Sequence, residues 1–128
     1  MSYPDKDYFP SLTGRNITFQ PGNFCIVRNS YKAIFQGDGN FVVYNGNTPV
    51  FASNTRDKNA TRLTFQSDGN LVIYSGYTPL WHTYTYNRMG ASNPSFPVLI
   101  MQSDGNLVIY GPDGRTPYWS TWTGPIYY

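Results

Sequence analysis

One pattern of side chains that can donate and accept hydrogen bonds, Gln-x-Asp-x-Asn-x-Val-x-Tyr, occurs three times in this chain. The stretch QSDGNLVIY stands at 66–74 and again at 102–110, and a close variant, QGDGNFVVY, stands at 36–44. Each copy offers a carboxylate acceptor, two amides that donate and accept, and a phenol hydroxyl that can do either, around one aliphatic side chain. A pyranose suits such a surface because its hydroxyls donate and accept while its C–H face prefers an apolar neighbour. The pattern therefore favours a neutral sugar over a phosphate or a metal ion.

The three copies define the candidate carbohydrate-binding residues, and no metal site or cofactor is expected. Turn formation alone accounts for Asp-Gly-Asn, but it gives no reason for the glutamine before and the tyrosine after to recur in every copy. The candidates are Gln36, Asp38, Asn40, Val42, Tyr44, Gln66, Asp68, Asn70, Val72, Tyr74, Gln102, Asp104, Asn106, Val108 and Tyr110.

Short strands and turns must position these residues. The Asp-Gly dipeptide in each copy is a strong hairpin signal, because glycine accepts a positive φ without a Cβ clash. An apolar segment precedes each copy, and a turn, a Thr-Pro pair, an aromatic residue and a Ser/Thr-x-Thr signature follow it. Each unit is therefore expected to be a strand, a tight turn, a strand, a second turn and a third strand. No apolar stripe of helical period is present, so essentially no helix is expected.

Strand alternation places the Asn, Val and Tyr of each copy on one face. The opposite face, which carries Phe41, Leu71 and Leu107, is expected to be buried. One unit cannot bury its apolar face alone, but three units can meet around a common axis. The recurring aromatic residues that are expected to fill the centre are Phe51, Trp81 and Trp119.

Composition excludes several other classes of protein. The 128 residues are expected to form one domain, 1–128, with three subdomains centred on the copies of the motif. The net charge of +2 is spread along the chain, so no nucleic-acid partner is expected. No stretch approaches the roughly 18 apolar residues of a membrane span, and no signal peptide is recognisable. We therefore expect a cytoplasmic protein, or one secreted by a route without a signal peptide. Cys25, the only cysteine, is expected to be a small buried hydrophobic residue.

An enzyme is not expected. A glycosidase needs two neighbouring carboxylates, whereas the motif aspartates belong to separate equivalent units. His82 stands at a repeat position that Ala52 and Ser120 fill in the other units, and no nucleophile signature accompanies it. We therefore expect a structural role for His82.

The motif resembles the mannose-binding signature of the monocot mannose-binding lectins, also called bulb-type lectins. The Trp-Ala-Ser-x-Thr that follows in that family is matched by residues 51–55, and more loosely in the other two units. The resemblance covers roughly residues 14–123. It implies an all-β, β-prism II fold of three antiparallel four-stranded sheets with pseudo-threefold symmetry and one carbohydrate site on each. The implied partners are mannose and high-mannose glycans, bound at up to three equivalent sites for multivalent recognition or cross-linking.

The resemblance also implies a role for each motif residue. Asp38 and Asn40 would hold the axial O2 of mannose. Gln36 would contact O3, Tyr44 would contact O4, and Val42 would lie against the ring carbons. The corresponding residues of the other two copies would do the same.

The chain departs from the family pattern at a few positions. Gly39 and Thr61 stand where plant members usually carry a disulfide, and Phe51 replaces the usual Trp.

Family resemblance further implies a homodimer that exchanges C-terminal strands, for which residues 118–128 are the candidate segment. Two alternatives stay open: an antimicrobial or toxin protein on a lectin scaffold, and a structural protein with inactive sites. A trefoil lectin would need a repeated Gln-x-Trp signal, which is missing.

Overall fold

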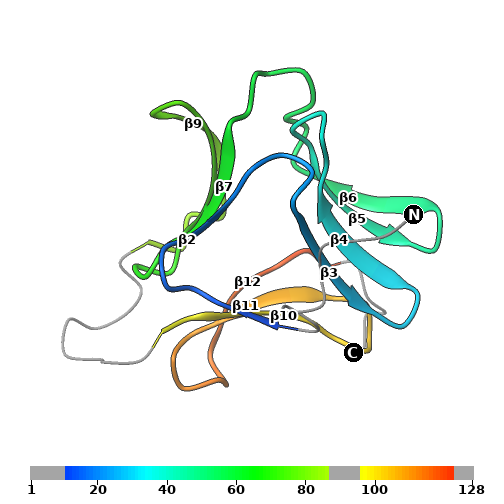
Figure 1. Ribbon diagram of the computed structural model, residues 1–128. Coiled ribbons are helices and arrows are strands. Elements are labelled where there is room, and N and C mark those ends of the chain that lie inside the picture. Colours follow the sequence, from blue (N-terminus) through cyan, green and yellow to red (C-terminus); the bar gives the residue numbers. More distant parts are fainter. Residues whose placement is uncertain (1–10, 87–95, 123–128) are drawn as a thin grey trace.

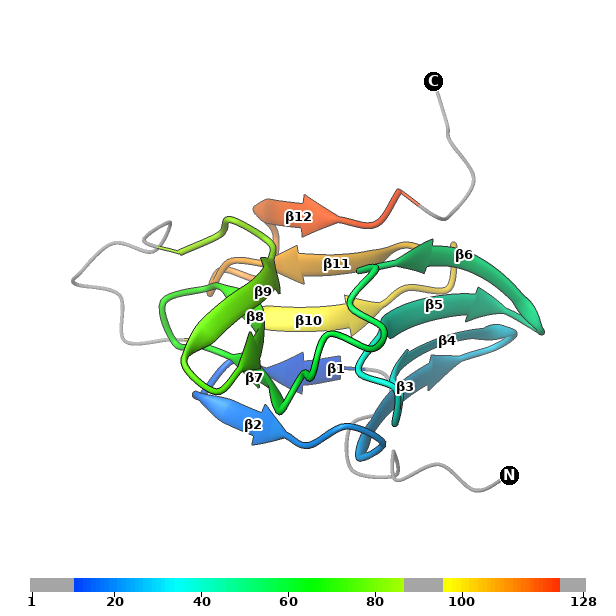
Figure 2. The ribbon, with the colours of Figure 1, turned by 90° about the horizontal axis from the view of Figure 1, so that it is seen from above.

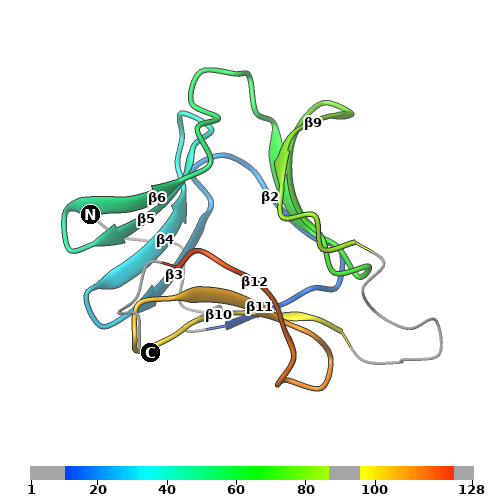
Figure 3. The same ribbon diagram turned by 180° about the vertical axis from the view of Figure 1, so that it is seen from behind.

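The chain folds into short strands and turns. The computed structural model describes residues 11–86 and 96–122, and within these ranges it contains twelve β-strands and no helix. The strands form three separate four-stranded antiparallel sheets, which face one another around a common centre (Figures 1 and 3). The expectation of an all-β chain with three four-stranded sheets is confirmed. Among the described residues there is accordingly no helix that could cross a membrane.

Each sheet contains one copy of the motif. The first sheet has the strand order β3 (Phe24–Arg28), β4 (Tyr31–Phe35), β5 (Phe41–Asn45) and β6 (Thr48–Ala52). The second has β2 (Ile17–Phe19), β7 (Arg62–Phe65), β8 (Leu71–Ser75) and β9 (Thr78–His82). The third has β1 (Ser11–Thr13), β10 (Val98–Met101), β11 (Leu107–Tyr110) and β12 (Pro117–Ser120).

The N-terminal segment supplies the fourth strand of every sheet. β1 pairs with β10, β2 with β7 and β3 with β4, so residues 11–28 run past all three units (Figure 2). The repeat analysis predicted three strands in each unit and did not locate these outer strands. β1 and β2 have only three residues each, which is too short for a readable alternation of polar and apolar residues.

The motif turn is a three-residue hairpin loop. In the first unit the backbone N–H of Gly39 donates to the carbonyl of Gln36 at 2.9 Å, and the N–H of Gln36 donates to Asn40 at 2.9 Å. Gly39 has a φ of +87°, as in a type I turn that is followed by a left-handed residue. Gln36 and Asn40 therefore stand opposite each other where the loop begins and ends. The second and third motifs repeat this hydrogen-bond pattern.

The core lies where the three sheets meet. Phe41, Leu71 and Leu107 are fully buried, which confirms the face predicted from strand alternation. The expected central aromatic cluster is also present: the three rings contact one another in edge-on pairs, with centroids 5.7–6.1 Å apart, and pack against the core while partly exposed. These rings belong to Phe51, Trp81 and Trp119. Cys25 is buried and unbonded to another cysteine, as expected.

Candidate carbohydrate sites

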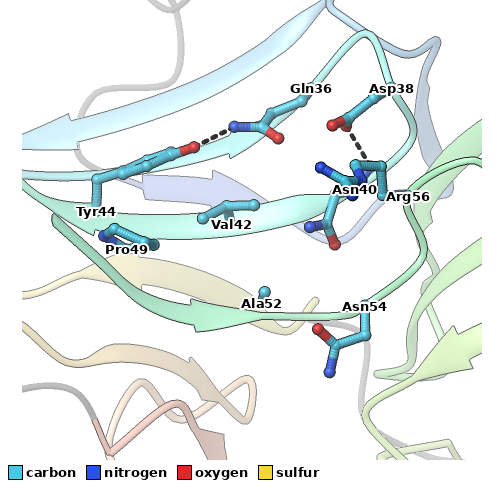
Figure 4. A pocket seen from close by; sticks show the side chains of 9 residues that line it. All are labelled: Gln36, Asp38, Asn40, Val42, Tyr44, Pro49, Ala52, Asn54 and Arg56. Atoms are coloured by element: carbon cyan, nitrogen blue, oxygen red, sulfur yellow. Dashed lines mark hydrogen bonds between the residues drawn. The ribbon is translucent and has the colours of Figure 1, made fainter. Parts of the chain in front are cut away.

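The five motif residues of the first unit gather around one hollow of about 480 Å³ (Figure 4). The loop between β4 and β5 supplies Gln36 and Asp38, Asn40 stands at its end, and β5 supplies Val42 and Tyr44. The other lining residues are Pro49, Ala52, Asn54 and Arg56, from β6 and the segment that follows it. Residues that are separated in the sequence by a strand and two turns therefore share one concave surface.

Hydrogen bonds within the first motif orient its polar groups. The Gln36 Nε2 amide donates to the hydroxyl of Tyr44, and the Asp38 carboxylate accepts the backbone N–H of Asn40 at 2.9 Å (Figure 4). The Lys32 ammonium group lies 5.4 Å from the centre of the Tyr44 ring, from the neighbouring strand β4. The carboxylate and the phenol thus have set directions in the hollow before any ligand is bound.

The asparagine is held by the Ser/Thr-x-Thr signature. The Asn40 Oδ1 atom accepts from the Ser53 hydroxyl at 3.1 Å and from the Thr55 backbone N–H at 3.2 Å. The Thr55 hydroxyl in turn donates to the carbonyl of Gly39 at 2.6 Å. The amide oxygen of Asn40 is therefore engaged by the protein, and its Nδ2 group is the part of the side chain that can serve a ligand.

Ser53 and Thr55 hold the candidate residue Asn40, and the sequence reasoning did not include them among the candidates. Both are buried. The signal that could have identified them was the recurrence of Ser/Thr-x-Thr after every motif. In the second unit Thr83 and Thr85 hold Asn70 in the same way, with two contacts of 3.2 Å to its Oδ1 atom.

In the second and third units a chain of hydrogen bonds links the aspartate, the glutamine and the tyrosine. With the Gln66 amide oriented to satisfy both neighbours, its nitrogen lies 3.2 and 3.3 Å from the Asp68 carboxylate oxygens, and its oxygen accepts from the Tyr74 hydroxyl at 2.7 Å. Gln102 relates to Asp104 and Tyr110 in the same way, at 3.1 and 3.3 Å from the carboxylate. The glutamine thus couples the two groups that are predicted to contact different sugar hydroxyls.

The motif valines form the floors of the three motif faces. Val42, Val72 and Val108 are only 3%, 2% and 6% exposed. The apolar contact expected for the sugar ring is therefore a small patch at the base of each face, and the polar side chains stand around it.

In the second unit the motif asparagine, Asn70, has a side-chain neighbour that the first unit lacks, His82. The Asn70 Nδ2 group lies 3.3 Å from the Nδ1 atom of His82, and this Nδ1 atom also accepts the Tyr84 backbone N–H at 3.2 Å. His82 was expected to be structural, and it does hold Tyr84, but it also engages one N–H of the Asn70 amide and leaves the other N–H for a ligand. The three motif faces are therefore alike in sequence but not in surroundings.

No metal centre accompanies the motifs: in residues 11–86 and 96–122 no group of three or more His, Cys, Asp or Glu residues could hold a metal ion. The chain has no match among protein-family models or curated proteins. Solved structures do resemble it.

A monomeric monocot mannose-binding lectin from Gastrodia elata is 33% identical, over 91% of this chain and 99% of that one, with a TM-score of 0.77. The Polygonatum cyrtonema lectin, solved with monomannoside, is 38% identical over the same shares, with a TM-score of 0.67. The snowdrop (Galanthus nivalis) mannose-specific agglutinin, solved with methyl-α-D-mannoside, is 32% identical, again over 91% and 99%, with a TM-score of 0.68.

Three four-stranded sheets, each with a motif hairpin on its surface, define a β-prism II lectin. This chain belongs to the monocot mannose-binding lectin family. Lectins bind carbohydrate without transforming it, so the expectation that the chain is not an enzyme is confirmed.

Proposed function

We propose that this chain is a mannose-binding lectin and that the terminal α-mannose of a glycan occupies the hollow of the first unit and the corresponding faces of the other two. The observation that carries the proposal is the gathering of all five residues of the first motif around one open hollow of about 480 Å³. Two of the similar lectins were solved with a mannoside, which supports the same class of ligand for this chain.

In each residue of the first motif, the contacts within the protein leave a group that can bind a sugar hydroxyl or the sugar ring. The Asp38 carboxylate, held by a backbone N–H, is the acceptor for the axial O2, and the Asn40 Nδ2 group is the donor to it. Gln36 and Tyr44 serve O3 and O4, with Val42 beneath the ring. Glucose carries O2 equatorially, so it would leave the aspartate and the asparagine unpaired, which is costly.

The sharpest single test is Asn40→Asp in a variant whose other two motifs are disabled by Asp68→Asn and Asp104→Asn. Aspartate keeps an oxygen for Ser53 and Thr55 but removes the amide donor, so the variant should fold and lose retention on immobilised mannose. The parent with the intact first motif should be retained and should elute with methyl α-mannoside but not with galactose. Retention of the Asn40→Asp variant would contradict the site assignment.

Several motif faces on one rigid body would add avidity for glycans that present several mannoses. High-mannose glycoproteins and mannans are the ligands expected to gain most. Disabling one, two and then three motifs should weaken precipitation of a mannan far more steeply than it weakens binding of methyl α-mannoside. A loss of precipitation in simple proportion to the number of motifs would argue against multivalency.

A homodimer stays a prediction. The segment predicted to be exchanged, residues 118–128, includes the end of β12, which in the single chain pairs with β11 of its own chain; residues 123–128 lie outside the described part. The similar Gastrodia lectin is described as monomeric. Light scattering should give the mass of two chains for the full protein and of one chain after deletion of 123–128. An unchanged mass would contradict strand exchange.

The predicted cytoplasmic location, or export without a signal peptide, likewise remains a proposal.

A further inference from the structure

The rims of the three motif faces differ at one repeat position. In the first unit Asn54, the middle residue of the Ser/Thr-x-Thr signature, lines the hollow. The corresponding residues are Tyr84 in the second unit and Trp122 in the third. Both aromatic residues are exposed, Tyr84 to 71% and Trp122 to 76%. Two large rings thus project into solvent where the first unit has a small amide.

All three residues have a left-handed backbone, with φ values of 60°, 58° and 56° for Asn54, Tyr84 and Trp122. Asparagine adopts this conformation readily, whereas a bulky aromatic residue in it is an outlier. Asparagine in the first unit meets the demand of the turn without strain. The fold therefore does not require the aromatic residues in the other two units, and a strained, exposed ring beside a candidate site points to a role in binding.

The two aromatic residues are also held by side chains that the first unit lacks. The Tyr84 N–H donates to the His82 Nδ1 atom at 3.2 Å, and the Trp122 N–H donates to the Ser120 hydroxyl at 3.1 Å. Ala52, at the corresponding position of the first unit, has no acceptor. The His82 ring also lies against the Tyr84 ring, with centroids 3.9 Å apart. An exposed aromatic residue and a side chain that holds its backbone therefore occur together.

Trp122 borders a hollow of about 460 Å³ along β12, the edge strand of the third sheet. Pro117 and Ser120 line this hollow, and their counterparts Pro49 and Ala52 line the hollow of the first unit. Tyr118 and Trp119 complete its walls. Three repeat positions, those of Pro117, Ser120 and Trp122, thus line a hollow in both units, but the walls in the third unit are mainly aromatic and include none of its five motif residues. The motif lies on the adjacent strand, since β12 pairs with β11, which carries Val108 and Tyr110.

We propose that Tyr84 and Trp122 are platforms for the second sugar ring of an oligosaccharide whose terminal mannose lies on the motif of the same unit. The flat, electron-rich face of an aromatic ring suits the C–H face of a pyranose. The second and third units would then select α-linked oligomannosides. The affinity of the first unit for a terminal mannose would depend little on the sugar ring that follows it. This inference rests on the proposed function.

The test uses the third unit alone, in a chain whose first two motifs carry Asp38→Asn and Asp68→Asn. Calorimetric titration with methyl α-mannoside and with an α-linked mannotriose gives an affinity ratio for each variant. Trp122→Asn should lower the affinity for mannotriose roughly three- to tenfold and change that for the monosaccharide less than about twofold. Trp122→Tyr, which keeps a ring, should retain most of the preference for mannotriose.

The variants are expected to fold, because Asn54 shows that asparagine fits this backbone, and thermal unfolding checks this. Tyr77→Asn removes an exposed aromatic residue from the turn between β8 and β9 and serves as the matched control, with an unchanged ratio. The reciprocal change, Ala52→Ser with Asn54→Trp, should give the first unit a preference for mannotriose. Equal losses of affinity for both ligands, or no loss of affinity for mannotriose, would contradict the proposal that these aromatic residues are platforms for the second ring. Failure of the parent to bind either ligand would instead overturn the proposed function.

Discussion

Asn40 illustrates how a single residue can belong to the fold and to the site together. Its oxygen accepts from Ser53 and Thr55, while its nitrogen lies in the hollow of the first unit. Thr55 closes this arrangement by donating to the carbonyl of Gly39 in the motif loop. The conformation of the loop and the orientation of the amide that is proposed to bind the sugar therefore depend on the same buried hydroxyls.

Thr55→Val should therefore weaken both stability and binding. The substitution keeps the shape of the side chain but leaves the buried Gly39 carbonyl without its donor, which should cost about 1–3 kcal/mol of unfolding free energy. Urea denaturation measures this loss, and titration with a mannoside should show weaker binding to the first unit. Thr48→Val, at an exposed position, is the control and should be nearly neutral. Equal stability of the two variants would contradict the role given to Thr55.

At the scale of elements, hairpin loops do most of the positioning. The motif loop brings its aspartate and asparagine together because a left-handed glycine lets the chain reverse in three residues. The loop between β11 and β12 is held differently, by the exposed carboxylate of Asp113, which accepts from the hydroxyl and N–H of Thr116 and from the N–H of Arg115.

Gly39→Ala tests the motif loop. A Cβ at Gly39 would lie 2.9 Å from the Ala60 Cβ and would have to adopt a φ of +87°, so the variant should lose about 1–3 kcal/mol of stability. Gly37→Ala, two residues earlier, has open space and no positive φ, and should be neutral or slightly stabilising. Chemical denaturation of the two variants gives the comparison, and a Gly39→Ala protein as stable as Gly37→Ala would contradict this reading of the loop.

The loop between β11 and β12 should respond to acid. Hydrogen bonds from the hydroxyl of Thr116, then from the backbone N–H groups of Thr116 and Arg115, lower the pKa of Asp113 from 3.8 to about 2. A depressed pKa means that the stabilisation is complete above the ordinary value and is lost as the pH falls toward about 2. The stability advantage over Asp113→Asn should therefore shrink between these two values. An advantage that persists unchanged down to the lower pH would contradict the assignment.

At the scale of the whole molecule, the three units share their core and their outer strands. One ring from each sheet meets in the central cluster, and residues 11–28 give each sheet its fourth strand. No unit has a core of its own. The chain should accordingly unfold in one cooperative transition.

Trp119→Ala should weaken all three units together. Loss of a large ring from the centre should cost about 2–4 kcal/mol, less than for a fully buried tryptophan because Trp119 is partly exposed. Trp122→Ala, at the exposed tryptophan, is the matched control and should change stability by about 0.5 kcal/mol or less. Circular dichroism and aromatic fluorescence should report the same midpoint for each variant. Separate transitions for the units would contradict a shared core.

The features that depend on local chemistry could be predicted from the residues alone. Repetition of one motif indicated three equivalent units, Asp-Gly indicated the turns, and alternation indicated that Phe41, Leu71 and Leu107 are buried. These conclusions needed only residue types and short spacings, because turn conformation and strand alternation are local properties. The three-sheet fold came from the family resemblance, and it too is confirmed.

Contacts between residues far apart in the sequence became visible only in the folded chain. Asn40 contacts Ser53 and Thr55 from 13 and 15 positions away, and the two shortest outer strands pair with partners much later in the chain. Tyr84 and Trp122 adopt a backbone that their residue types disfavour, so no propensity could have indicated it. Packing and hydrogen bonds formed by the completed fold override local preference at these positions, and there the three motif faces become different from one another.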